Sequence, residues 1–393
     1  MARAGKHPFK PPEETSMKIR LALGSLALAA LAACGGGGNT ASISTPSTTE
    51  TTRVIAFGDS LTDGGAYSKG NSLILQGQGI PAAAANTVGK FTNSPGSVWV
   101  EVLAAKLGTT IAPERFEVGA ANPTAATNAL NSAANANNYA QGGARVAKTP
   151  GVGCNPNASG VCTAQAAVPV VTQIDRALAK GNFTATDLVL VWAGANDVFF
   201  NATLASNDLT ASTIAAGRAL TAAEQQAIVG KYVIAMEEAG LATMQQLRRL
   251  KAAGAQRVVV MTIPNAANSP YGDANAAAKP LLTALSDAYN NQLKKEISLS
   301  DPGVLLFDAG ALAASYRSNP AANGFTNVTI PVCNVPAALG NSSSFCSSLI
   351  TPWLFPVPAA TSLFADGVHP SLAAHDKFGN AVLEALRQKA WVK

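Results

Sequence analysis

The sequence predicts an α/β fold in which a parallel sheet is covered by helices on both faces. Short and almost uninterrupted apolar runs are bounded by Gly, Asp or Pro, as in strands buried on both faces. Segments with helical periodicity alternate with these runs, and this alternation is typical of βαβ units. We therefore expect a three-layer α/β/α domain over residues 53–393.

The elements follow one another along the chain in the order that this fold requires. We expect strands at Val54–Phe57, Leu188–Trp192, Arg257–Ile263 and Val304–Phe307. We expect helices at Val98–Leu107, Val170–Lys180, Thr221–Ala253, Pro280–Leu299 and Ser371–Lys389. Weakly periodic segments rich in Ala, Asn and Ser are expected to be insertions that form rim or lid loops. They cover residues 68–96, 114–136, 199–220 and 313–360.

Composition and charge exclude several classes of function. The 393 residues are 48% hydrophobic and 13% charged, so the chain can bury a full core. A net charge of +5 without a long basic run indicates neither nucleic-acid binding nor electrostatic membrane binding. The histidines are His7, His369 and His375, and no Cys-x-x-Cys or His-Glu-x-x-His motif occurs. A metal site with nitrogen or sulfur ligands is therefore not expected.

The first 34 residues predict a leader and a lipoprotein signal peptide, with the start at Met1 or at Met17. Lys18 and Arg20 precede an apolar run that ends in Leu-Ala-Ala directly before Cys34. This order resembles a bacterial lipoprotein signal, in which Cys34 becomes the lipidated first residue. A plain secretory signal cleaved nearby is the alternative, as is a membrane anchor, although the apolar run is short for spanning a bilayer.

Residues 35–52 are rich in Gly, Ser and Thr and predict a flexible tether. With Cys34 as a lipid anchor, the protein would be exported to the bacterial cell envelope and held at the outer membrane, or else secreted. The remaining cysteines form two close pairs, Cys154 with Cys162 and Cys333 with Cys346. An even number in an exported chain favours disulfides, which we expect to form within each pair. Buried free thiols are the alternative.

Polar residues follow two of the predicted strands at their carboxyl ends, where open α/β sheets bind ligands. The stretch VIAFGDSLTDGG places Ser60 directly after the first strand, and AGAND places Asn196 after the second. A serine becomes a good nucleophile only when a base accepts its proton and a third group orients that base. A turn or a helix N-cap is the structural alternative for Ser60.

The base is expected in FADGVHPS, near the C-terminus. Pro370 and Ser371 indicate a helix start, which leaves the ring of His369 free in the preceding loop. Asp366 is close enough to accept the ring N–H and to hold the required tautomer. His375, inside the predicted helix, is interpreted as a packing or surface residue.

Donors for an oxyanion are also present. The candidates are the Ser60 N–H, the Gly143 N–H in NYAQGGARV and the Asn196 side chain, with Gly142 as the alternative to Gly143. Taken singly, the glycines indicate an ordinary turn and Asn196 a helix cap or Asx-turn. Asp59 and Asp63 are expected to stabilise the loop after the first strand. Trp192 is expected in the core.

Four blocks in this order, GDSLTD, NYAQGGA, GAND and DGVHP, resemble those of the GDSL lipase/esterase family, also called SGNH hydrolases. The resemblance implies a flavodoxin-like sheet and hydrolysis of esters or thioesters without a cofactor. It places the family residues on Ser60, Gly143, Asn196 and His369, with Asp366 as the triad acid. The chain has no G-x-S-x-G motif, which argues against the α/β-hydrolase fold.

The resulting prediction is a serine hydrolase of carboxylic acyl esters that works through a Ser-His-Asp triad and an acyl-enzyme. Its substrate would be an acyl ester or a lipid, so esterase, lipase and lysophospholipase activities all fit. One alternative is an O-acetyl esterase acting on polysaccharide. Another is an envelope binding protein that has lost catalysis on the same scaffold. Pocket depth separates the first two, and the sequence does not give it.

Overall fold

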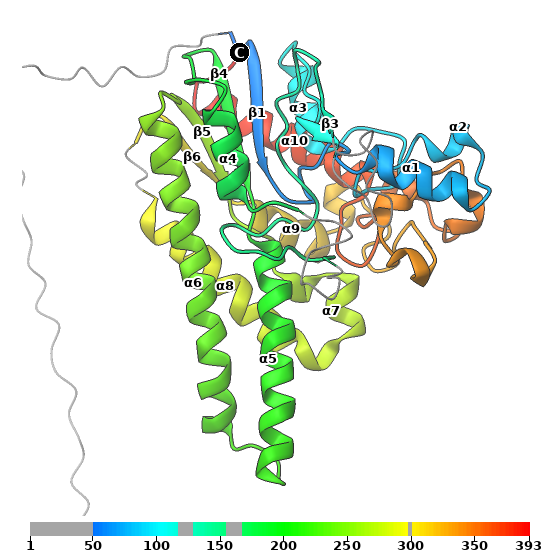
Figure 1. Cartoon of the computed structure of the whole chain (residues 1–393), viewed down its shortest axis with the longest axis vertical. Coiled ribbons are helices and arrows are strands. Elements are labelled where there is room, and N and C mark those ends of the chain that lie inside the picture. Colours follow the sequence, from blue (N-terminus) through cyan, green and yellow to red (C-terminus); the bar gives the residue numbers. More distant parts are fainter. Residues whose placement is uncertain (1–49, 117–128, 155–166, 298–300) are drawn as a thin grey trace, which may run out of the picture. The chain divides into compact units, whose positions relative to one another are not determined.

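The computed structural model describes residues 50–116, 129–154, 167–297 and 301–393, and it contains the predicted parallel sheet (Figure 1). Its four strands lie in the order β1-β4-β5-β6, and every neighbouring pair is parallel. They are β1 (Arg53–Gly58), β4 (Asp187–Trp192), β5 (Arg257–Met261) and β6 (Val304–Phe307). All four predicted strands are confirmed, with ends that differ by at most two residues.

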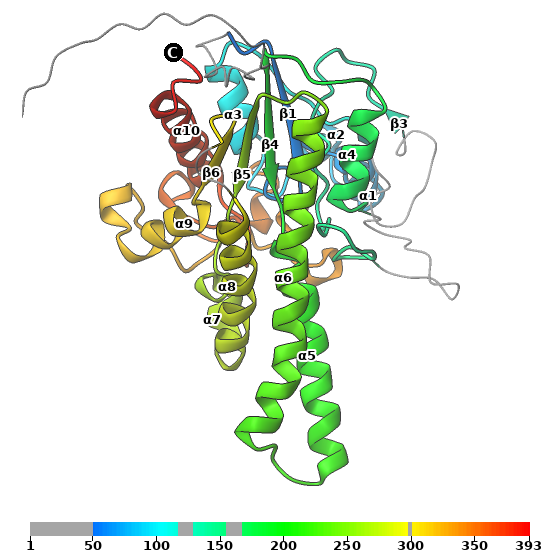
Figure 2. The ribbon, with the colours of Figure 1, turned by 90° about the vertical axis from the view of Figure 1, so that its left-hand side faces the viewer.

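The five predicted helices are present and cover both faces of the sheet. Figure 2 shows α3 and α10 on one side of the strands and α4 and α6 on the other. The helices are α3 (Trp99–Lys106), α4 (Val170–Leu178), α6 (Ala222–Ala252), α8 (Lys279–Glu296) and α10 (Leu372–Gln388). The α/β/α fold class is therefore confirmed.

Local sequence explains where α10 and α6 begin. Ser371 caps α10 by accepting the Ala374 N–H at 3.2 Å, which fixes the point where the preceding loop ends. Thr221 and Glu224 form a reciprocal capping box at the start of α6. These short polar signals make both helix starts predictable from sequence.

The main core lies between the sheet and its helices. Every residue of β4 and β5 is buried, as expected for central strands of a parallel sheet. Trp192 is 1% exposed and packs between Trp99 and Phe378, with ring centroids 5.7 and 5.4 Å away. The predicted core position of Trp192 is confirmed.

The prediction of a loop over residues 199–220 was wrong. Residues 195–216 form helix α5 (Ala195–Ala216), which turns at Gly217 and runs antiparallel to α6. The hydroxyls of Thr203, Thr210 and Thr213 donate to backbone carbonyls one turn earlier, so these residues satisfy their polar groups within the helix. Packing against α6 stabilises a helix whose own sequence has little periodicity.

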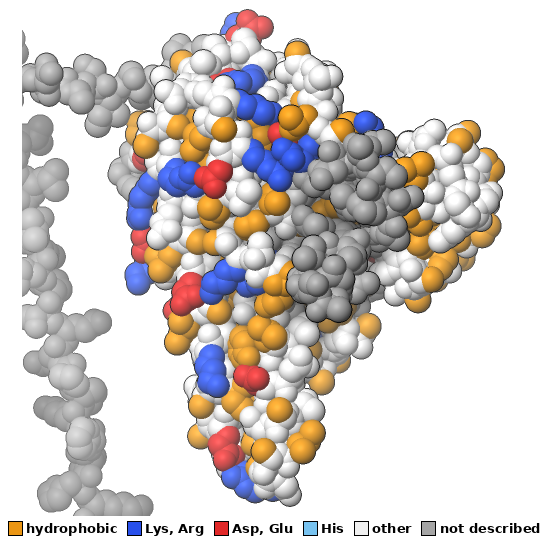
Figure 3. Space-filling model, in the orientation of Figure 1, with side chains coloured by type: hydrophobic (Ala, Val, Ile, Leu, Met, Phe, Trp, Pro, Cys, Tyr) orange, Lys and Arg blue, Asp and Glu red, His pale blue; other side chains and the backbone are white. Residues whose placement is uncertain are grey.

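The α5–α6 pair extends well beyond the sheet (Figure 1). Its outer part carries exposed apolar side chains, including Ile214 at 75% and Ile234 at 57% exposure. On the face shown in Figure 3, hydrophobic side chains lie there among few charged ones. Arg218 and Glu224, near the connecting turn, form an ion pair with each other.

The other three insertions also contain regular structure. Residues 68–96 hold α1 (Ser68–Gly77) and α2 (Ala82–Ala85), and α9 (Ala309–Ser318) reaches into the last insertion. Strands β2 (Arg115–Phe116) and β3 (Ala129–Leu130) pair at the edges of the second one. Helix α7 (Pro270–Ala274) completes the regular elements. The 3₁₀ turns are η1 (Ala266–Asn268), η2 (Ala276–Ala278), η3 (Ala321–Asn323), η4 (Ala337–Leu339), η5 (Ser343–Phe345), η6 (Thr351–Trp353) and η7 (Ala359–Thr361).

Two insertions far apart in sequence pack together into a second, smaller core. We call residues 68–96 and 331–358 the insertion lobe; Figure 1 shows its two parts side by side. Leu75, Ala85 and Val88 contribute from the first part. Phe345 and Ile350 contribute from the second. Two loops that could not bury enough surface singly thus stabilise each other.

A disulfide joins Cys333 to Cys346 within the insertion lobe, with Cα atoms 6.0 Å apart. This predicted pair is confirmed. Cys162 lies outside the described residues, so the pairing of Cys154 with Cys162 stays a prediction.

The predicted signal peptide, Cys34 and most of the tether fall outside the described residues. Within the described part of the chain, no helix combines the length and apolar character that crossing a membrane would require. Export and lipidation therefore remain predictions.

Candidate active site

Ser60 lies in the first turn after β1, at the carboxyl edge of the sheet. The Asp59 carbonyl accepts the N–H groups of Thr62 and Asp63, both at 3.0 Å, which folds the chain back immediately after the strand. At Gly58, a Cβ atom would stand 2.2 Å from the Trp192 carbonyl oxygen. The close approach of β1 to β4 therefore requires glycine just before the turn.

The structure brings Ser60, His369 and Asp366 together. Ser60 Oγ lies 2.8 Å from His369 Nε2. His369 Nδ1 lies 2.7 Å from Asp366 Oδ2 and 2.9 Å from Oδ1. Because a carboxylate can only accept, Nδ1 carries the proton and Nε2 is free to accept from the serine hydroxyl. Asp366 and His369 both lie in the loop before α10. A hydrogen bond of 2.8 Å from the Ala365 N–H to the His369 carbonyl closes this loop.

Asp366 is held as a carboxylate. Burial by itself would raise its pKa, but the neighbouring His369 and the hydrogen bonds from His369, Ser343 and Val368 outweigh burial. The net effect keeps the pKa of Asp366 well below its ordinary value. A buried negative charge next to Nδ1 is suited to stabilising a protonated histidine.

The two candidate oxyanion glycines differ in their hydrogen bonds. The Gly142 N–H donates to Asp63 Oδ2 at 2.9 Å, so it is already used. The N–H groups of Gly143 and Ser60 have no acceptor within the described part of the chain. Gly143 has a φ of +88°, and a Cβ there would stand 2.2 Å from the Val152 carbonyl oxygen. Conformation and space both require glycine at this position.

Asn196 lies in the first turn of α5 and faces the same cavity as Ser60. Its Nδ2 donates to the Ala144 carbonyl at 3.0 Å. Because an amide nitrogen has two hydrogens, one remains for a ligand. The bond to Ala144 also ties Asn196 to the segment that contains Gly143.

Sequence reasoning missed a buried ion pair that fixes this segment. Arg145 Nε lies 3.2 Å from Asp197 Oδ1, and the Val146 N–H donates to Asp197 Oδ2 at 2.9 Å. Both charged side chains are at most 5% exposed. The Asp197 carboxylate thus clamps the glycine loop onto the start of α5. The only sequence signal was the Asp directly after Asn196, which also fits a helix cap.

Asp63 and Asp59 stabilise the turn around Ser60. Asp63 Oδ1 accepts the Gly65 and Ala66 N–H groups at 2.8 and 2.7 Å, and burial raises its pKa to about 6. Asp59 Oδ1 accepts the Leu61 N–H at 3.0 Å, and burial raises its pKa to about 7. These contacts agree with the loop-stabilising role expected for both residues.

His375 is completely buried in α10, away from the Ser60 hydroxyl. Its Nδ1 accepts the Trp99 N–H at 3.2 Å, at the first residue of α3. Burial, with smaller effects from His369 and Lys90, lowers its pKa to about 3. His375 is therefore a neutral packing residue that joins two helices.

A cavity of about 400 Å³ contains Ser60, Asn196 and His369 in its wall. This volume is within the range of sites that hold small organic ligands. Most of the wall is apolar, and it comes from α5, from residues 264–271, from α9 and from the loop before α10. Examples are Val198, Phe199, Ala313, Leu363, Phe364 and Val368. Among the described residues, no group of three His, Cys, Asp or Glu side chains could hold a metal ion.

Comparison with known protein families finds a match over most of the chain. The family described as GDSL-like Lipase/Acylhydrolase matches residues 54–382, which is most of the chain. The matched region contains all of the candidate residues, from Ser60 to His369. No curated protein matches the chain.

Proposed function

Because this chain belongs to the GDSL-like lipase/acylhydrolase family, a family of hydrolases that act on esters, we propose that it is a serine hydrolase of carboxylic acyl esters. The observation that carries the proposal is the chain of contacts from Ser60 Oγ through His369 to Asp366, with distances of 2.8 and 2.7 Å. Ser60, at one end of this row of contacts, lies in the wall of an apolar cavity. A nucleophile, a base and an orienting acid in one row are what acyl transfer requires.

In the proposed mechanism, Ser60 Oγ attacks the acyl carbon while its proton moves to His369 Nε2. Asp366 stabilises the imidazolium that forms. The carbonyl oxygen becomes negative and is bound by the N–H groups of Ser60 and Gly143 and by Asn196 Nδ2. His369 then gives the proton to the leaving alcohol, which leaves an acyl-enzyme. Water, activated by His369 in the same way, releases the acid and restores Ser60.

The apolar cavity favours an acyl chain over an acetyl group on a sugar. Asn265, Asn268 and Ser269 also line the cavity and can hydrogen-bond hydroxyls, but most of the exposed lining is apolar. Phe199, Leu363 and Phe364 can cover methylene groups. This supports esterase, lipase or lysophospholipase activity over polysaccharide deacetylation. The contacts around Ser60 also argue against a scaffold that has lost catalysis, because the complete hydrogen-bonded row is present.

The test is a chain-length series of p-nitrophenyl esters, together with lysophosphatidylcholine and an acetylated sugar. We expect kcat/KM to rise from acetate toward longer chains and the acetylated sugar to be a poor substrate. Release of free acid, compared with transfer to an added alcohol, separates hydrolysis from acyl transfer. A preference for the acetylated sugar would contradict the assignment.

A variant of the cavity wall tests whether the acyl chain binds in this cavity. Ala313 lines the cavity, so Ala313→Leu should lower kcat/KM for long acyl chains while activity on the acetate ester stays close to wild type. An equal loss on both substrates would place the acyl chain elsewhere.

We also propose that the protein is exported and attached to the cell envelope through lipid chains on Cys34. Support comes from the Leu-Ala-Ala-Cys sequence and the Gly/Ser/Thr-rich segment after it. Two acyl chains hold a protein at a membrane far better than one. Cys34→Ser should move the protein from the detergent phase to the aqueous phase on phase partitioning. Unchanged partitioning would reject the anchor.

A further inference from the structure

The Asp366 carboxylate receives hydrogen bonds from two sources. Its own loop supplies the Val368 and His369 N–H groups, at 2.9 and 2.8 Å, and the ring of His369. From outside that loop, within the described part of the chain, it receives the Ser343 N–H at 2.8 Å on Oδ2. Asp366 is 5% exposed. Bulk water therefore cannot easily replace a lost donor.

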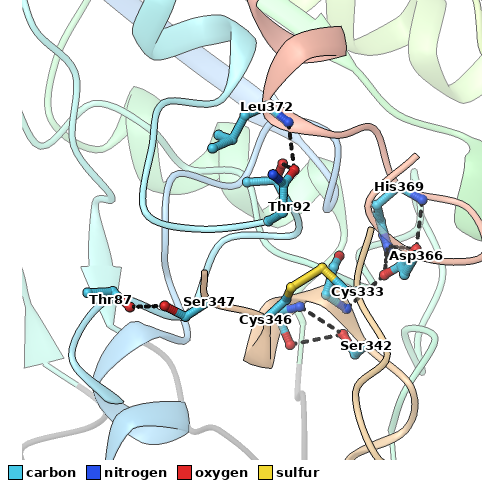
Figure 4. The surroundings of a disulfide bond; sticks show 12 residues. Thr87, Thr92, Cys333, Ser342, Cys346, Ser347, Asp366, His369 and Leu372 are labelled. Atoms are coloured by element: carbon cyan, nitrogen blue, oxygen red, sulfur yellow. Dashed lines mark hydrogen bonds and ion pairs between the residues drawn. A yellow bond between two sulfur atoms is a disulfide. The ribbon is translucent and has the colours of Figure 1, made fainter. Parts of the chain in front are cut away.

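Ser343 is the first residue of the η5 turn of the insertion lobe. The disulfide links the residue after this turn to Cys333, which is hydrogen-bonded to the loop that contains Asp366. Cys346 directly follows η5, and its N–H donates to the Ser343 carbonyl at 2.9 Å. The partner cysteine, Cys333, donates its N–H to the Ala365 carbonyl at 2.9 Å, directly before Asp366. Figure 4 shows the Cys333–Cys346 bond close to Asp366 and His369. The crosslink thus connects the two segments that donate hydrogen bonds to Ala365 and to Asp366.

We propose that the Cys333–Cys346 disulfide positions the triad acid, by holding the Ser343 N–H against Asp366 Oδ2. The proposal rests on the proposed function. The position of a backbone N–H depends on the conformation and position of the turn to which it belongs. The Ser344 carbonyl of this turn also accepts hydrogen bonds from the Gly89 N–H at 2.8 Å and from Asn71 Nδ2 at 3.0 Å. Residues 334–342, which lead into the turn, contain only the short η4. Without the crosslink, the turn can shift, and Asp366 Oδ2 then keeps the His369 ring as a donor but loses the Ser343 N–H.

The consequence concerns orientation at Nδ1. Oδ1 stays held by the Val368 and His369 N–H groups, so a carboxylate that has lost the Ser343 N–H can pivot about Oδ1. His369 Nδ1 follows because it is hydrogen-bonded to both Asp366 oxygens. The Nε2 atom then points less directly at Ser60 Oγ. Small misplacements of a catalytic group lower the rate of chemistry more than they weaken substrate binding.

The first experiment removes the crosslink. The variant Cys333→Ala/Cys346→Ala is assayed on a p-nitrophenyl ester, well below its thermal unfolding temperature. We expect kcat to fall on the order of tenfold to 10²-fold with KM nearly unchanged. Val335→Ala is the control, because Val335 is buried in the same small core and, among the described residues, makes no hydrogen bond to Ser343 or to either cysteine. It should lower the melting temperature and leave kcat unchanged. A wild-type kcat in the cysteine variant overturns the proposal.

A double-mutant cycle then separates positioning from general loosening. If the disulfide acts through Asp366, its removal from an Asp366→Asn enzyme should cost little further kcat. An equal loss in both backgrounds overturns the proposal. If wild-type protein hydrolyses no ester, or Ser60→Ala keeps full turnover, the proposed function fails instead, and the two failures are distinguishable.

Should the cysteine variant not fold, Ser343→Pro provides the test with the disulfide intact. Ser342 is extended, with φ −85° and ψ 129°, and proline is favoured at the first position of a helical turn, so the turn tolerates it. Ser343→Ala, which removes only the hydroxyl that also acts on Asp366, is the control and should lose less kcat. Ser343→Pro removes the hydroxyl together with the N–H that reaches Asp366. We expect the same fall in kcat, and a wild-type kcat in the folded variant overturns the proposal.

Discussion

The loop at residues 365–370 and the helix α10 that follows it each contain a histidine, and the two serve different purposes. The His369 side chain is 15% exposed, faces the cavity and lies between Ser60 and Asp366. His375 is fully buried and accepts a hydrogen bond from the backbone of α3. No carboxylate is hydrogen-bonded to His375 in the described structure. Histidine chemistry is therefore decided by partners and access rather than by residue type.

The difference also concerns charge. His369 has a buried carboxylate at Nδ1, so a proton taken from Ser60 can be stabilised. At His375, burial strongly disfavours the charged form and lowers the pKa to about 3. A base that cannot hold a proton at neutral pH cannot serve in acyl transfer. The following variants test this contrast, from the largest expected effect to the smallest.

Ser60→Ala and His369→Ala should have the largest effect, lowering kcat for ester hydrolysis by roughly 10⁴-fold to 10⁶-fold. Each removes one end of the 2.8 Å contact on which proton transfer depends. The double variant should be no worse than either single one, because the residues act as one unit. Steady-state kinetics measures this, with circular dichroism to check the fold. Normal turnover in Ser60→Ala would show that the chemistry lies elsewhere.

Asp366→Asn should cost about 10⁴-fold in kcat. The amide removes the negative charge beside Nδ1 and favours the wrong ring tautomer, although the base remains. Single-turnover kinetics would separate this loss from product release. An Asp366→Asn enzyme with wild-type kcat would mean that His369 needs no orienting acid.

Asn196→Ala should cost roughly 10²-fold to 10³-fold in kcat, since it removes one of the three proposed oxyanion donors. Asn201→Ala is the matched control on the same helix, because Asn201 donates to the Asp197 carbonyl and does not line the cavity. It should keep wild-type kcat. If the two variants behaved alike, Asn196 would act through the structure of α5 rather than on the oxyanion.

His375→Asn should leave kcat at the wild-type value and lower stability by roughly 1–3 kcal/mol. The asparagine oxygen can take the place of Nδ1 as acceptor for the Trp99 N–H, while the rest of the ring is lost. Urea unfolding and the ester assay on the same preparation measure both effects. A His375→Asn protein as inactive as His369→Ala would reverse the assignment of the two histidines.

The pH dependence of the unfolding free energy provides a further test of His375→Asn. The pKa of His375 is about 3 in the folded protein against 6.5 ordinarily, so the unfolded chain binds the proton more tightly between these values. Wild-type stability attributable to His375 is therefore lost as pH falls below 6.5, by about 2 kcal/mol at pH 5. Asp59 and Asp63, whose pKa values are raised by burial, act in the opposite direction in both proteins and cancel in the difference.

We therefore expect the gap in unfolding free energy between wild type and His375→Asn to shrink by this amount from pH 7 to pH 5. Parallel pH profiles for the two proteins would mean that His375 is protonated equally in folded and unfolded chains.

Much of the fold was predictable because its signals are local. The apolar runs of β1, β4, β5 and β6 follow from burial on both faces. Capping signals at Thr221 and Ser371 mark where two helices begin. The motifs around Ser60 and His369 indicate the chemistry because a nucleophile and a base need particular residues at strand ends and helix starts.

The remaining features depend on contacts between distant segments, for which the sequence has no local pattern. Helix α5 is stable because α6 packs against it, the insertion lobe forms because two insertions share one core, and Gly142 is distinguished from Gly143 by the Asp63 carboxylate. The Ser343 N–H that donates to Asp366 belongs to the backbone, so the residue type at position 343 does not predict this contact. Sequence determined which residues could perform the chemistry; tertiary structure decided their partners, because hydrogen bonds and burial are properties of segments brought together in space.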